Sequence, residues 1–147
     1  KKGYIADPSN VDNLYLLSAF HMQTGKIQDA VTHLTELIGI YPWHVGGHYD
    51  LGVALSSQGK KEEAKYYLAR ADTLGMIERQ LNQHQLRASR FPGDSGNWVK
   101  IGKLFFQSGR YEKAIEAFNI ALSIKPDDEF ANRAVRELEL MRRDRTQ

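Results

Sequence analysis

Two histidines and two adjacent acids are the residues whose types and spacing could do chemistry. His44 and His48 are four residues apart, so on a helix both imidazoles would lie on one face and could chelate a metal ion. A metal site needs a third or fourth ligand, so packing is the simpler role for both histidines. Glu62 and Glu63 open an expected helix, where acids favour the helix dipole, so capping is a better interpretation than an acid/base pair.

No signature of catalysis accompanies these residues in the sequence. It contains no phosphate-binding glycine loop, no nucleophile elbow and no HExxH motif. It also contains no cysteine, which excludes disulfides, thiolate chemistry and cysteine-based zinc sites. The sequence therefore predicts a protein that is not an enzyme and that holds no metal and no cofactor.

The composition is that of an ordinary folded chain. Apolar residues make up 41% and charged residues 26% of the 147 residues, which predicts order over most of the length. A formal charge of +2 gives no argument for a nucleic-acid or membrane partner, and no apolar run approaches the ~20 residues that cross a bilayer. The chain starts at Lys1 without an initiator Met, so we expect a piece of a longer protein, from either cytoplasm or periplasm.

The helices that would position His44, His48 and the two adjacent acids follow a 34-residue period. Successive prolines are 34, 50 and 34 residues apart, and the glycines that suit a left-handed helix end are 34 and 50 residues apart. Both series indicate a 34-residue repeat interrupted once by 16 extra residues (50 − 34). The two series are Pro8, Pro42, Pro92 and Pro126, and Gly25, Gly59 and Gly109. The repeats align at 11–44, 45–78 and 95–128, with the insertion at 79–94.

Each repeat has the apolar spacing of two helices. Trp98, Ile101 and Phe105 are spaced i, i+3, i+7, which predicts one face of a helix. Equivalent stripes are Leu14, Leu17 and His21; Ala30, Leu34 and Leu37; and Ala114, Phe118 and Ala121. Gly52 and Gly102 fall where two helices would cross closely, which offsets the ~1 kcal/mol that a glycine costs in a helix. We predict helices at 11–24, 27–41, 45–58, 61–74, 95–108 and 111–124.

This pattern resembles the tetratricopeptide repeat, a helix-turn-helix unit of 34 residues, over three repeats of the chain. The third repeat carries the family pattern at Trp98, Ile101, Gly102, Phe105, Gly109, Tyr111, Ala114, Phe118, Ala121 and Pro126. His48 and His21 stand at large aromatic positions of the family, which favours packing roles for both. The resemblance implies one all-α domain over residues 1–147, a right-handed superhelical solenoid of antiparallel helix pairs.

Three segments lie outside the repeats. Apolar residues spread over 76–91 indicate an inserted helix, either a plain connector or a wedge that changes the angle between repeats two and three. Residues 128–145 place Ala131, Ala134, Val135, Leu138 and Met141 on one face, which predicts a helix that caps the array. Pro8 falls in phase with the other prolines, so residues 1–10 are expected to end a preceding repeat.

The resemblance also implies where a partner would bind, because the first helix of each repeat lines a concave groove in this family. The implied groove residues are Tyr15, Ala19, Met22, Tyr49, Val53, Val99, Lys103 and Phe106. This surface is mainly apolar and aromatic, as interaction sites are, although single residues could instead pack against neighbouring helices. One subgroup of the family grips chaperone C-terminal carboxylates with a Lys/Asn/Arg clamp. Here those positions hold Tyr15, Ala19, Asp50 and Gly96, and only Lys100 fits, which argues against chaperone-tail binding.

The leading interpretation is a scaffold that binds a partner peptide or helix, or that assists assembly of a multiprotein complex. Nucleic-acid binding is an alternative, since Lys100, Lys103, Arg110 and Lys113 give some positive charge around repeat three. The 34-residue period fits the protein-binding family better. An accessory domain of a larger enzyme and self-association through exposed repeat ends are the remaining alternatives.

Overall fold

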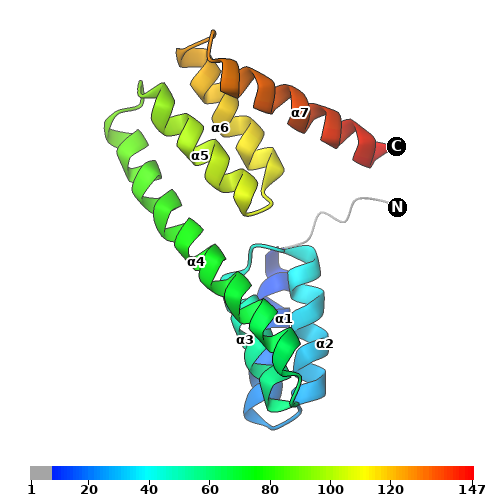
Figure 1. The fold of residues 1–147 in the computed structure, drawn as a ribbon. Coiled ribbons are helices and arrows are strands. Elements are labelled where there is room, and N and C mark those ends of the chain that lie inside the picture. The colour runs from blue at the N-terminus through cyan, green and yellow to red at the C-terminus, as the bar shows by residue number, and fades with distance from the viewer. Residues whose placement is uncertain (1–7) are drawn as a thin grey trace. The chain divides into compact units, whose positions relative to one another are not determined.

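The computed structural model describes residues 8–147, which form seven α-helices and no strand (Figure 1). The helices are α1 (Pro8–Gln23), α2 (Ile27–Ile40), α3 (Val45–Ser57), α4 (Lys61–Arg90), α5 (Ser95–Gln107), α6 (Tyr111–Ile124) and α7 (Glu129–Thr146). The all-α helical repeat fold expected from the sequence is confirmed. The chain divides into two compact units, Lys1–Gly75 and Met76–Gln147, each of which is considered by itself.

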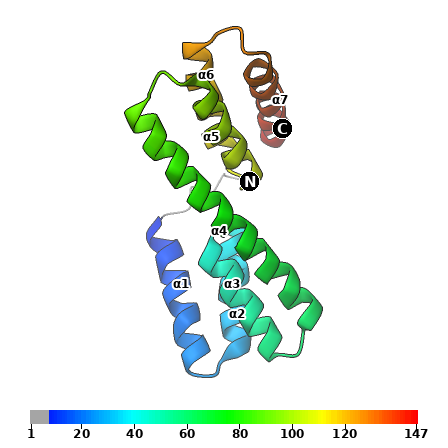
Figure 2. The same cartoon turned by 60° about the vertical axis from the view of Figure 1, so that its left-hand side comes forward.

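The first unit has its core between α1, α2, α3 and the beginning of α4 (Figure 2). Leu34, Leu37 and Leu51 are among its most deeply buried side chains. Gly25 and Gly59 take positive φ values of 75° and 81°, which lets one helix end and the next begin within a few residues. The residue after each glycine donates its N–H to the carbonyl five residues earlier, as in the Schellman motif.

The second unit has its core between the end of α4 and the helices α5, α6 and α7. Ile101 and Phe118 are almost completely buried in it, and α4 contributes Ile77 and Leu81. Gly109 closes the α5–α6 turn with φ 83°, the same geometry as in the first unit. Helix α7 buries Ala131 and Leu138 against this core, which is the packing that a terminal helix supplies in a repeat array.

The largest departure from the predicted elements is in α4. We expected one helix to end at residue 74 and the insertion to form another, but α4 continues without a break from Lys61 to Arg90. No proline interrupts the segment before Pro92, and Gly75 alone costs a helix only about 1 kcal/mol. Ile77, Leu81 and Ala88 share one buried face, so packing in the second unit favours continuation of the helix.

The start of α1 also differs from expectation. Pro8 is the first residue of α1, three residues earlier than expected, because its fixed φ and missing N–H suit the first turn of a helix. The expected end of a preceding repeat falls mainly on residues 1–7, which lie outside the described residues. Within α1 the buried stripe runs through Val11, Leu14 and Ser18. Leu17 was expected in the core but is 46% exposed, because the helix is turned so that its neighbour Ser18 takes the buried position.

Candidate functional site

In the first unit, Tyr15 on α1 meets the beginning of α3. Its hydroxyl donates a hydrogen bond to the carboxylate of Asp50, and its ring lies 4.9 Å from the ring of His44, measured between centroids. A Cβ on Gly46 would be 2.5 Å from the hydroxyl oxygen, so the glycine makes room for the phenol. Burial, and then the negative charge of Asp50, raise the pKa of Tyr15. Tyr15 and Asp50, which stand at two of the carboxylate-clamp positions, thus interact with each other.

His44 and His48 have structural roles at the beginning of α3. Nδ1 of His44 accepts a hydrogen bond of 2.8 Å from the N–H of Gly47, so the imidazole caps the helix. Nε2 of His48 lies 2.8 Å from the carbonyl oxygen of Pro42, and the ring is buried beside Tyr67. Burial lowers the pKa of both histidines below its usual range. Each imidazole therefore serves packing or capping.

The other expected groove residues of the first unit differ in exposure. Tyr49 and Val53 on α3 are 54% and 38% exposed. Ala19 and Met22 on α1 are half-buried, and Met22 packs against the core of the unit. Tyr49 and Val53 are one helical turn apart, so they present one continuous apolar strip to solvent.

In the second unit, the three expected groove residues do not share one environment. Val99 is only 9% exposed and belongs to the hydrophobic core, because its side of α5 is covered within the unit. Lys103 and Phe106 lie on the exposed side of α5, and Phe106 is 46% exposed. The Phe106 ring is 5.5 Å from that of Tyr111, which begins α6.

Lys103 and Phe106 line a pocket of about 390 Å³ that α5 shares with α7, hereafter the α5–α7 pocket. It is lined by Lys103, Phe106, Gln107, Phe118, Phe130, Arg133, Ala134, Glu137, Leu138 and Met141. More than half of this lining comes from α7, which was expected only to cap the array. Phe130, Ala134, Glu137 and Met141 are spaced i, i+4, i+7, i+11, so they share a helix face that could have indicated a second role for α7.

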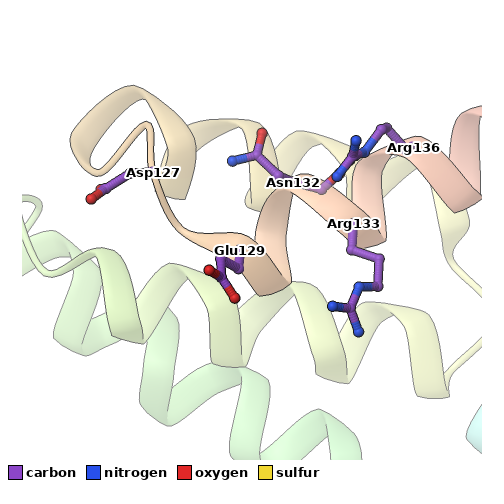
Figure 3. A pocket seen from close by; sticks show the side chains of 5 residues that line it. All are labelled: Asp127, Glu129, Asn132, Arg133 and Arg136. Carbon is purple, nitrogen blue, oxygen red and sulfur yellow. The ribbon is translucent and has the colours of Figure 1, made fainter.

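A polar hollow of about 410 Å³ lies at the start of α7 (Figure 3). Its lining is Asp127, Glu129, Asn132, Arg133 and Arg136. Glu129 and Arg133 extend from the same side of α7, while the Asn132 amide donates to the carbonyl oxygens of Pro126 and Asp128. The amide therefore supports the turn into α7. Arg133 is the one side chain that the two hollows share.

Residues 8–147 contain no cluster of three or more His, Cys, Asp or Glu side chains arranged to hold a metal ion. Within the same range, none of the helices combines the length and apolarity that crossing a bilayer requires.

Comparison with known proteins places the repeat in a family. Residues 98–128 match the model of the tetratricopeptide repeat family. A crystal structure of MamA is similar at 25% identity and a TM-score of 0.45, over 92% of this chain and 70% of MamA. The first tetratricopeptide repeat region of Spaghetti, bound to an HSP90 peptide, has 15% identity and a TM-score of 0.46, over 95% and 98%. The Yersinia enterocolitica type III secretion translocator chaperone SycD has 16% identity and a TM-score of 0.47, over 97% and 90%.

A comparison with curated proteins gives no match. The family match begins at the third-repeat tryptophan, Trp98, and extends just past the repeat's closing proline, Pro126. The segment it covers contains most of the helix pair α5 and α6, with the Gly109 turn between them. The resemblance read from the sequence is thereby confirmed, and residues 98–128 of this chain form a tetratricopeptide repeat.

Proposed function

We propose that this chain binds a partner protein through the exposed faces of the first helices of its repeats. Tetratricopeptide repeats are generally scaffolds for protein–protein interaction, and repeat arrays present extended surfaces for this purpose. The observation that carries the proposal is the exposure of Tyr49, Val53 and Phe106, large apolar side chains on α3 and α5. Tyrosine in particular is enriched among the side chains that dominate the energy of protein interfaces.

The proposed partner is a peptide or helix, and we propose that it is not a chaperone C-terminal tail held by a carboxylate clamp. The tyrosine at one clamp position, Tyr15, donates to the Asp50 carboxylate at another. A negative charge at this place repels a carboxylate ligand, which supports the exclusion. We further propose that the chain itself is not an enzyme, in keeping with the binding role of its family.

Two observations weigh against nucleic acid as the partner. Arg110 is paired with Glu78, and Lys113 is 3.4 Å from Glu116, so two of the four basic side chains around repeat three are neutralised. Binding to nucleic acid would fall steeply as salt is raised, whereas binding through apolar side chains would not. Measuring capture at low and high salt therefore separates the two partners.

The test is capture of partners from a lysate of the source cells by the full chain. Tyr49→Ala and Phe106→Ala should each reduce capture, because each removes an exposed aromatic side chain from a first helix. Tyr66→Ala and Leu86→Ala are matched controls on α4, since Tyr66 is 66% and Leu86 is 57% exposed. Equal capture by wild type and both groove variants, with folding verified by circular dichroism, would refute the proposal.

A further inference from the structure

The α5–α7 pocket is apolar at its centre and cationic at its rim. Phe106, Phe130 and Met141 are 46%, 48% and 39% exposed although they line the same hollow. Its volume of about 390 Å³ is within the range of about 300–1,000 Å³ that is usual for pockets that bind small ligands. A partner side chain inserted here would cover apolar surface from both helices.

The two cations of the rim are Lys103 and Arg133. Lys103 places Nζ 4.3 Å from the centroid of the Phe130 ring, and Arg133 follows one turn of α7 later. Neither forms an ion pair with any residue in the range 8–147. Glu137 is the one acid among the residues that line the pocket.

Four other cations of the second unit already have acidic partners, and one of them is Lys113, which lies 3.4 Å from Glu116. Arg87 is bound to Asp94, Arg110 to Glu78, and Arg142 to both Glu112 and Glu139. On α5 itself the charged residues are Lys100 and Lys103, with no acid. The surface of α5 beside the pocket is therefore positively charged, and an acidic segment would complement it.

We propose that the α5–α7 pocket binds a segment of a partner protein in which a bulky apolar side chain stands beside one or more carboxylates. The apolar side chain packs between Phe106, Phe130 and Met141, and a carboxylate pairs with Lys103 and Arg133. A hydrogen-bonded ion pair next to buried aromatic surface is stronger than one in open solvent, because less water screens it. This inference rests on the proposed function and names the chemistry of the partner at one site.

The first unit has the opposite charge at its corresponding helices, which makes the preference specific to the pocket. Asp50 on α3 accepts the Tyr15 hydrogen bond, and Asp12 on α1 is exposed. An acidic segment is repelled there and attracted at Lys103 and Arg133. Charge complementarity thus directs the segment to one unit, as it does in other interfaces.

The test uses a displayed library of random peptides of about twelve residues, long enough to follow a helix face in extended or helical form. The full chain selects from this library in parallel with Lys103→Glu and with Lys125→Glu. The second variant makes the same charge change at an exposed residue outside the pocket. Binding of the most enriched peptide is then measured by fluorescence anisotropy, with Phe106→Ala as a further variant.

Enriched peptides should combine a Phe, Tyr, Trp, Leu, Ile or Met with Asp or Glu within a few positions. Lys103→Glu should weaken the best peptide by about tenfold, which corresponds to about 1.4 kcal/mol, and Lys125→Glu by less than about twofold. Phe106→Ala should weaken it by a similar or larger factor. Replacing the apolar residue of the peptide by Ala should abolish binding.

The proposal fails if selection enriches Lys and Arg, if it yields no bias towards acids, or if Lys103→Glu selects the same peptides as wild type. Failure here and failure of the proposed function are distinguishable. A lysate partner that Phe106→Ala loses, together with peptides that lack acids, keeps the binding function and overturns only this chemistry. If the library shows no enrichment over bare resin and the lysate yields no partner, the binding function and the proposed partner chemistry are both overturned.

Discussion

Gly102 and Phe118 are in direct contact across the crossing of α5 and α6. A Cβ placed on Gly102 would lie 2.5 Å from Cε1 of the Phe118 ring, which is shorter than real Cβ contacts. The Phe118 ring is almost completely buried, so it has no free space to move into. The first unit repeats this relationship, with 2.6 Å from a Cβ on Gly52 to Cγ of Leu68.

Overpacking a core usually costs about 1–3 kcal/mol, and Gly102→Ala should incur this cost. The ~1 kcal/mol that Ala gains over Gly in a helix offsets part of it, so the net destabilisation should be about 0–2 kcal/mol. Gly52→Ala should behave in the same way, since the backbone oxygen of Ala64 is only 3.2 Å from the added carbon. Urea unfolding followed by circular dichroism measures both changes.

Gly39→Ala is the matched control, and it should raise the free energy of unfolding instead of lowering it. Gly39 lies within α2 and is exposed, and a methyl group added there would meet no atom of another element within 4 Å. Only helix propensity then acts, so a gain of about 0.5–1 kcal/mol is expected. If Gly39→Ala and Gly102→Ala had the same effect, close helix crossing would not explain the glycine at position 102.

Acid should destabilise the first unit through His44 and His48. Burial lowers the pKa of both, so the unfolded chain takes up protons near pH 6.5, where the folded protein still excludes them. The free energy of unfolding is then highest above about pH 6.5 and falls as the pH drops towards the lower folded pKa values. Protonation of Nδ1 in His44 would also remove the acceptor that caps α3.

Thermal unfolding of wild type, His48→Gln and His44→Asp between about pH 7.5 and 5.5 tests this pH dependence. His44→Asp keeps a capping side chain that does not titrate in this range, and a Gln amide at position 48 can still donate to Pro42. A variant that carries both His44→Asp and His48→Gln should lose most of the pH dependence of stability above about pH 5.5. An unchanged slope would assign the acid sensitivity to other groups.

Asp94 should stabilise α5 through a cap and an ion pair. Oδ1 accepts from the N–H of Asn97 at 3.1 Å, and Oδ2 accepts from Nε and Nη2 of Arg87 at 3.1 and 3.0 Å. The N–H of Asn97, and then Arg87, lower the pKa of the carboxyl group, so this stabilisation is present above about pH 4 and is lost as the pH falls further. Asp94→Ala should lower the melting temperature more than Asp94→Asn, which retains the cap. Equal effects would show that the cap contributes nothing.

The stability of the second unit should depend strongly on the buried polar side chain of Asn97. Asn97 is 3% exposed, its Oδ1 is 2.7 Å from Nδ1 of His84, and its Nδ2 donates to the His84 carbonyl oxygen at 2.9 Å. Asn97→Ala would leave the His84 imidazole without this partner and remove the second bond to the His84 carbonyl oxygen, at a cost of about 1–3 kcal/mol. Asn119→Ala, at an exposed position on α6, should change stability by no more than about 0.5 kcal/mol in the same unfolding experiment.

Proline and glycine punctuation, together with apolar spacing, predicted five of the six repeat helices to within a few residues, because these signals act locally along the chain. Gly25, Gly59 and Gly109 adopt the left-handed conformation that the 34-residue spacing indicated. The same local signals could not show that α4 continues through Gly75, since a single glycine leaves both outcomes open and packing decides between them.

The amino-acid sequence by itself determined the repeat, its turns and its helices except the extent of α4, and it singled out Lys103 and Phe106. Only the tertiary structure decided that Val99 is buried, that Leu17 is exposed, and that Phe130 of α7 completes a pocket with Phe106. Periodicity shows which residues share a face of a helix, whereas burial depends on whether another element covers that face. Contacts between helices distant in sequence therefore complete the candidate site.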